Sequence, residues 1–258
     1  MRRAAFNRRR AVFLFSAFPL LIAPRRASSQ EEQTETLGLE ADNPLQPIAA
    51  NYQSLGSYQD KGTVVTRYQW PGTPLLEEHH RFETAFRVPR NFFFRFDADP
   101  ASGGDVYVIW CDGGPFQSWW KATGTHTVHD NGQGAVAFFT GQQASKDAAN
   151  LVAPFFFPQA DLVGPAYRLI PPVTQESGTL DERICRKISA AERVSGSQTR
   201  EHRPTTVWVD DETLLIRKVV IGPDAGSDPK LIDEKTFIVD AQANPELPDS
   251  RFTFTPPE

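Results

Sequence analysis

The stretch TTVWVDDETLLIRKVVI, from Thr205 to Ile221, has an apolar arm on each side of three consecutive acids. Val207 and Val209 alternate with Trp208 and Asp210 in the first arm, and alternation resumes after the acids. A period of two is typical of half-buried β-strands. The stretch therefore predicts two antiparallel strands joined by a turn at the acids.

The three acids, Asp210, Asp211 and Glu212, could hold a metal ion, act as a catalytic pair or form the turn. Aspartate is favoured at turns because its carboxylate accepts hydrogen bonds from nearby backbone N–H groups. A calcium or magnesium loop needs oxygen ligands spread along a longer excursion of the chain. The turn is therefore the favoured interpretation, and we predict no metal and no cofactor for this chain.

Other segments repeat the strand pattern. Residues 91–99, NFFFRFDAD, place Phe92, Phe94 and Phe96 on one face of a strand. Residues 104–111, GDVYVIWC, are apolar on both faces, so another part of the chain has to cover the second face. Further strands are predicted in residues 61–70, 81–88, 183–190, 234–240 and 251–257.

Two segments have helical spacing. Apolar residues recur on one helical face from Leu45 to Leu55, and Gly56 ends the pattern. Small and apolar residues recur at helical spacing over residues 137–151, and Pro154 is expected to end this second helix. This order of elements predicts a mainly-β protein, an antiparallel meander that helices cover.

Residues 1–29 have the parts of a secretory signal, with early arginines, an apolar run at 11–23 and small residues from Ala27 to Ser29. The run is shorter than the roughly 20 apolar residues of a membrane span, so no stable span is expected. We expect cleavage near Ser29 and export by the Sec or twin-arginine route, which places the protein in the periplasm or outside the cell. Residues 30–43 are predicted to be a flexible leader and residues 44–258 a single domain.

The charge of the chain limits its partners. It has 27 basic and 32 acidic residues, and seven of the basic ones are arginines of residues 1–29. The rest of the chain is therefore more acidic than the whole. Nucleic acid is not an expected partner, because phosphate binding depends on clustered lysine and arginine, and an anionic membrane surface would repel such a chain.

The hairpin and the end of the chain together resemble the LolA/LolB-like lipoprotein-carrier superfamily. The matching features are Trp208-Val209-Asp210, the acidic turn, TLLIRKV, and the ending FTFTPP with Phe252 and Phe254. The resemblance implies a curved, incomplete antiparallel barrel, closed by a helical lid around an apolar cavity for lipid acyl chains. It also implies a non-enzymatic role in envelope lipid or lipoprotein trafficking, with a lipid ligand and an envelope protein as partners.

Aromatic residues of the predicted strands are the candidate lining of that cavity, where we expect their rings to face a ligand. This predicted ligand-binding set consists of Tyr68, Trp70, Phe82, Phe86, Phe92, Phe94 and Phe96. The alternative is that the rings fill an ordinary core. The protein would then be a structural or interaction module of the cell envelope without a ligand.

A hydrolase is the remaining alternative. It would use Asp112, Ser118 or a histidine, and these groups would have to lie within hydrogen-bond reach of one another. No G-x-S-x-G motif occurs in the chain, so no catalytic residue is predicted. The pairs His79–His80 and His126–His129 cannot each chelate one ion from a regular strand, and all four histidines are expected at the surface.

Cys111 and Cys185 both lie in apolar, strand-like segments. An oxidising compartment permits a disulfide between them, but two buried free thiols are an equally ordinary outcome. Neither cysteine has a histidine beside it in the sequence. Thiol catalysis is therefore not predicted.

Overall fold

The structure, a computed structural model, describes residues 44–98, 103–129, 143–158, 169–193, 202–223, 227–228 and 231–257. The predicted signal and leader, residues 1–43, lie outside the described residues. Within the part of the chain that is described, no helix is long and apolar enough to cross a membrane.

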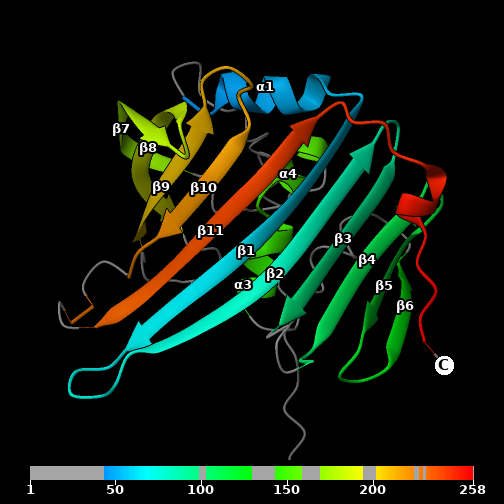
Figure 1. Cartoon of the computed structure of the whole chain (residues 1–258), viewed down its shortest axis with the longest axis horizontal. Helices are drawn as coiled ribbons and strands as arrows, with labels where there is room; N and C mark the ends of the chain where they lie inside the picture. The colour runs from blue at the N-terminus through cyan, green and yellow to red at the C-terminus, as the bar shows by residue number, and fades with distance from the viewer. Residues whose placement is uncertain are drawn as a thin grey trace, which may run out of the picture. The chain divides into compact units, whose positions relative to one another are not determined.

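The described residues form one eleven-stranded antiparallel sheet whose edge strands are β6 and β7 (Figure 1). Its order, β6-β5-β4-β3-β2-β1-β11-β10-β9-β8-β7, consists of two meanders that meet where β1 pairs with β11. The mainly-β, antiparallel fold class predicted from the sequence is confirmed. The strands are β1 (Ser57–Gln69), β2 (Leu76–Arg87), β3 (Asn91–Ala98), β4 (Val106–Asp112), β5 (Phe116–Trp120), β6 (Thr125–His129), β7 (Leu169–Leu180), β8 (Arg183–Arg193), β9 (His202–Asp210), β10 (Ile216–Ile221) and β11 (Ile232–Ala243).

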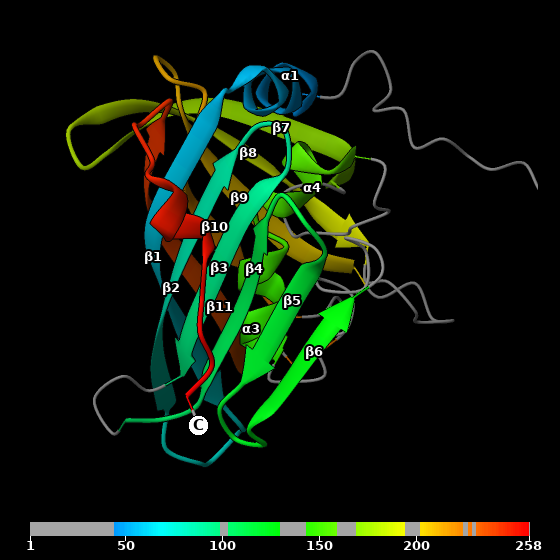
Figure 2. The ribbon, with the colours of Figure 1, turned by 90° about the vertical axis from the view of Figure 1, so that its right-hand side faces the viewer.

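Among the described residues, three α-helices lie with this sheet: α1 (Gln46–Ser54), α3 (Gln143–Ala149) and α4 (Ala153–Phe156). Helices α3 and α4 lie against one face, called the inner face here, and α1 lies across one end of the strands (Figure 2). The apolar face predicted between Leu45 and Leu55 is buried in the main core together with α3, α4 and the inner side chains of the strands. Apolar burial on this face holds the helices to the sheet.

The second predicted helix differs from its prediction. Pro154 does not end a helix but lies in the first turn of α4, where its missing N–H costs no helical hydrogen bond. Helix α3 already ends at Ala149, and residues 137–142 lie outside the described residues.

A smaller core lies on the outer face of the sheet. Phe93, Trp110 and Trp119 are buried there beneath Phe252. The second face of β4 is therefore covered by the C-terminal segment and not by an α-helix of the described residues. Residues 251–257 were predicted to be a strand, and this prediction is wrong: the 3-10 helix η2 (Asp249–Phe252) precedes residues without strand pairing. Both edges of β11 are already paired, with β1 and β10, so the following segment crosses the outer face instead.

Neither edge strand, β6 or β7, had a clear signal in the sequence. Strand β6 exposes four of its five residues, and β7 has no apolar side chain from Thr174 to Thr179. The β7 ladder has a register shift between Ile170 and Thr174, where two prolines interrupt the segment. Edge strands need no alternating apolar face, and this explains why the period-two pattern did not reveal them.

Candidate functional site

The acidic hairpin is a turn, as predicted. Asp210 Oδ1 accepts hydrogen bonds of 3.0 Å from the backbone N–H groups of both Glu212 and Thr213. Asp210 is itself buried, and its Oδ2 lies 3.3 Å from Arg217 Nη2 and 3.2 Å from Arg183 Nη1. Burial alone would raise the pKa of Asp210, but these hydrogen bonds and the two arginines lower it overall.

Five of the seven predicted ligand-binding residues come together on the inner face. Phe82, Phe86, Phe92, Phe94 and Phe96 belong to one cluster, with exposed fractions of 0–5%. This clustering agrees with the strand alternation read from the sequence. The rings lie in a packed interior, however, and do not face open space as expected.

Helix α4 and the residue after it fill the space beside these rings. Phe86 stacks on Phe156 with 4.3 Å between the ring centroids. The next residue, Phe157, meets the rings of Phe92 and Phe116 edge-on, at 5.5 and 5.6 Å. An aromatic lid therefore covers an aromatic sheet face, and both surfaces are apolar.

Tyr68 and Trp70 lie apart from the phenylalanines. They are at the far end of β1, where their rings meet edge-on at 5.6 Å. Trp70 is 55% exposed. The structure therefore does not place these two residues with the rest of the predicted ligand-binding set.

The histidines differ from the prediction in part. His79 and His126 are exposed, as expected, but His80 and His129 are buried. His80 shares the inner face of β2 with Phe82 by strand alternation, and His129 lies opposite the buried Phe116 in the ladder of β5 and β6. The alternation of β6 was not recognised in the sequence. The expectation of four surface histidines is thus corrected for these two.

Two groups of the hydrolase alternative meet. Ser118 Oγ and His129 Nε2 lie 2.9 Å apart across β5 and β6, and the Tyr107 hydroxyl also hydrogen-bonds with Ser118. Asp112 is exposed, and its Oδ1 accepts a hydrogen bond from the Gly114 N–H. The predicted combination of serine, histidine and Asp112 is therefore not assembled.

Both cysteines are buried and free, so of the two alternatives the structure has the free thiols. Cys111 lies on β4 and Cys185 on β8, with six strands of the sheet between them. Burial raises the pKa of both thiols. Across the described ranges, no group of three or more histidine, cysteine, aspartate or glutamate side chains could hold a metal ion.

No protein-family model and no curated protein matches the sequence. Similar solved structures include a LolA superfamily protein from Nitrosomonas europaea, at 10% identity and a TM-score of 0.33 over 81% of this chain and 97% of that one. An outer membrane lipoprotein-sorting protein domain from Vibrio parahaemolyticus has 8% identity and a TM-score of 0.34 over 80% and 93%. LprF from Mycobacterium bovis has 11% identity and a TM-score of 0.39 over 83% and 94%.

The chain has an open antiparallel half-barrel fold. This statement rests on its open antiparallel sheet with helices on the inner face, which is the half-barrel predicted from the sequence. TM-scores below 0.4 concern the general arrangement of the strands, and they assign neither a ligand nor an activity.

Sequence reasoning missed an ion pair of this half-barrel. Lys235 Nζ of β11 lies 2.6 Å from Asp147 Oδ2 of α3, with side chains 8% and 16% exposed. Lys235 shares the inner face with Phe237 and Val239 by strand alternation. The only hint of this ion pair in the sequence is a lysine at an inward-facing position of a strand. No sequence signal links Lys235 to Asp147.

A buried carboxyl group is the second feature that was missed. Asp60 of β1 accepts hydrogen bonds from the Tyr58 hydroxyl at 2.7 Å and from the Thr84 N–H at 2.8 Å. Burial raises the pKa of Asp60 to about 7, and the two hydrogen bonds offset this only in part. Its signal in the sequence is the i, i+2 spacing from Tyr58, which puts both side chains on one strand face.

Proposed function

We propose that this protein is exported and binds a lipid or another apolar molecule on the inner face of its sheet, without catalysing a reaction. A role in envelope lipid or lipoprotein trafficking follows from this proposal. The observation that carries it is the contact between the phenylalanine row of β2 and β3 and the aromatic side chains of α4.

The physical argument is the nature of this contact. Ring packing and apolar burial are non-directional, so acyl chains can replace the lid's rings without leaving a buried polar group unpaired. A lid held by hydrogen bonds would lack this property. The proposed ligand site consists of Phe82, Phe86, Phe92, Phe94 and Phe96, and α4 would have to move for the ligand to enter.

The full burial of the same rings favours a second candidate, an interaction module of the cell envelope whose inner face is filled by its own helices. In this second candidate α4 stays packed against the inner face of the sheet, and the protein binds no ligand. The two candidates differ in whether the rings can be reached by an apolar molecule.

The experiment is uptake of a fluorescent fatty acid by the purified protein, with lipids extracted from the same preparation identified by mass spectrometry. Phe94→Ala should weaken uptake, whereas Phe93→Ala should not, because Phe93 lies on the outer face of the same strand. Both variants delete a buried ring, and each should lose about 3–5 kcal/mol of stability, so the control is matched. Absence of uptake and of co-purifying lipid in the unaltered protein would favour the interaction module.

A further inference from the structure

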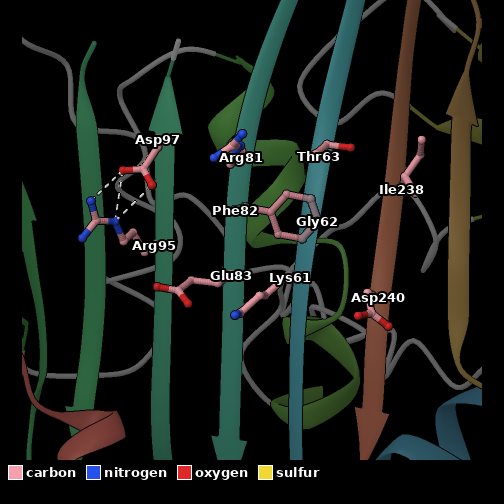
Figure 3. Close-up of a pocket in the computed structure, with 10 residues that line it drawn as sticks. All are labelled: Lys61, Gly62, Thr63, Arg81, Phe82, Glu83, Arg95, Asp97, Ile238 and Asp240. Carbon is pink, nitrogen blue, oxygen red and sulfur yellow. Dashed lines mark hydrogen bonds and ion pairs between the residues drawn. The ribbon is translucent and has the colours of Figure 1, made fainter. Parts of the chain in front are cut away.

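An open groove of about 560 Å³ lies on the outer face of the sheet, and Phe82 is the one member of the phenylalanine row that borders it. Side chains from four adjacent strands line it, and Figure 3 shows them in front of the ribbon of the inner helices. Strand alternation gives the reason for its polar character. Neighbours of the inner phenylalanines, such as Glu83 and Arg95, point outward into this groove.

Two acids of the groove are already paired with arginines. Arg95 donates two hydrogen bonds to Asp97 Oδ1, from Nε at 3.0 Å and from Nη2 at 2.9 Å. Arg251 of the C-terminal segment binds Glu83 at 2.9 Å. The negative charges of Asp97 and Glu83 are therefore offset before any ligand binds.

Two cations of the groove remain without a carboxylate. Arg81 opposes Asp97 in the ladder, and Lys61 opposes Glu83, yet neither forms an ion pair with a described residue. Lys61 and Arg81 occupy diagonal positions on β1 and β2, within reach of one bound group for side chains of this length. Unpaired cations stand out in a chain with more acids than bases.

We propose that this outer groove binds an oxyanion, a carboxylate or phosphate group, with Arg81 and Lys61 as its cationic ligands. The guanidinium of Arg81 can hold two oxygens of such a group at once, and the ammonium of Lys61 adds a point charge. The remaining acid, Asp240, opposes Lys61 from β11 and has no ion pair with a described residue. Its charge repels the anion, which is therefore expected nearer to Arg81.

The groove can also contact an apolar portion of the ligand. Ile238 of β11 borders the groove and is 46% exposed, although large aliphatic side chains are usually covered. Thr63 lies between Ile238 and Arg81 in the ladder. Arg81 and Ile238 thus lie in one row across three strands, and Lys61 lies in the neighbouring row.

The test is isothermal titration calorimetry of the folded chain with inorganic phosphate and, separately, with hexyl phosphate. We expect Arg81→Gln to weaken binding roughly tenfold and Lys61→Gln roughly threefold. Asp240→Asn should strengthen it, because a repelling charge is removed. Lys121→Gln, which removes the same charge from an exposed residue after β5, should leave binding unchanged.

The two probes distinguish two sources of the oxyanion. If hexyl phosphate binds more tightly than inorganic phosphate, and if Ile238→Ser removes this difference in affinity, the groove is assigned to a lipid-like anion. If the two probes bind with equal affinity, the groove is assigned to a free anion. No saturable heat with either probe, or unchanged binding in both Arg81→Gln and Lys61→Gln, overturns the proposal. The proposed inner site is tested by fatty-acid uptake, which these outer-face variants should not change, so each proposal can fail alone.

Discussion

Lys235 of β11 and Asp147 of α3 form an ion pair of 2.6 Å that ties helix α3 to the inner face of the sheet. Both side chains are largely buried, and the Lys235 ammonium depends on the Asp147 carboxylate for its charge to be compensated. This ion pair holds α3 against the sheet, whereas ring contacts hold α4.

Asp147→Asn should therefore be strongly destabilising, because it leaves the Lys235 ammonium buried without a carboxylate. Breaking a buried pair from one side costs about 3–5 kcal/mol. The double variant Lys235→Met/Asp147→Leu should recover most of this loss, since no buried charge remains. Urea unfolding of Lys235→Met, Asp147→Leu and the double variant measures the coupling between the two residues, and purely additive losses of stability would contradict the prediction.

The three acids of the hairpin should differ sharply in importance. Asp210→Asn removes the carboxylate from the buried Arg217 and should cost about 3 kcal/mol or more. The double variant Asp211→Asn/Glu212→Gln should stay within about 1 kcal/mol, because Asp211 has only a half-exposed pair with Arg186. Equal losses in thermal unfolding would argue against this division.

The lowered pKa of Asp210 also predicts an acid dependence. Its stabilising effect is present above the unfolded pKa of about 3.9 and is lost as the pH falls through the lower folded value. The stability gap between the unaltered protein and Asp210→Asn should therefore narrow below about pH 4. Urea midpoints measured at pH 6 and at pH 3 check this.

Asp60 predicts a pH dependence of opposite sign. Its pKa is raised to about 7, so between about pH 4 and pH 7 the folded state keeps a proton that the unfolded chain releases. The contribution of Asp60 to stability therefore falls as the pH rises through this window and is constant above it. Asp60→Asn should remove this slope from urea midpoints measured between pH 5 and pH 8. An unchanged slope in the variant would assign the dependence to another group.

Phe252 should hold the C-terminal segment on the outer face. It is fully buried against the outer core, and Arg87 lies over its ring at 5.0 Å. Phe252→Ala should cost about 3–5 kcal/mol and shift tryptophan emission to longer wavelength, because Trp110 and Trp119 gain contact with water. Ile184→Ala, at a residue that is 67% exposed, is the control and should change stability by less than about 0.5 kcal/mol.

Much of this architecture could be predicted from local pattern. Alternation in residues 91–98 placed Phe92, Phe94 and Phe96 on one face and Phe93 on the other, and the two cores of the structure separate them in this way. The acids after Val209 were recognised as a turn because an aspartate carboxylate caps nearby N–H groups within a few residues. Such signals are local, so the sequence alone contains them.

Other features depended on contacts between distant residues. The phenylalanine row is closed by α4, whose rings are about seventy residues further along the chain, and no periodicity in β2 or β3 reveals that cover. The path of the C-terminal segment depends on β11 having both edges paired, and the pairing of Lys235 with Asp147 spans 88 residues. The sequence by itself determined which face each strand side chain takes, because alternation is a property of the local backbone. Only the tertiary structure decided what covers each face, because burial and charge pairing depend on which distant segments the folded chain brings together.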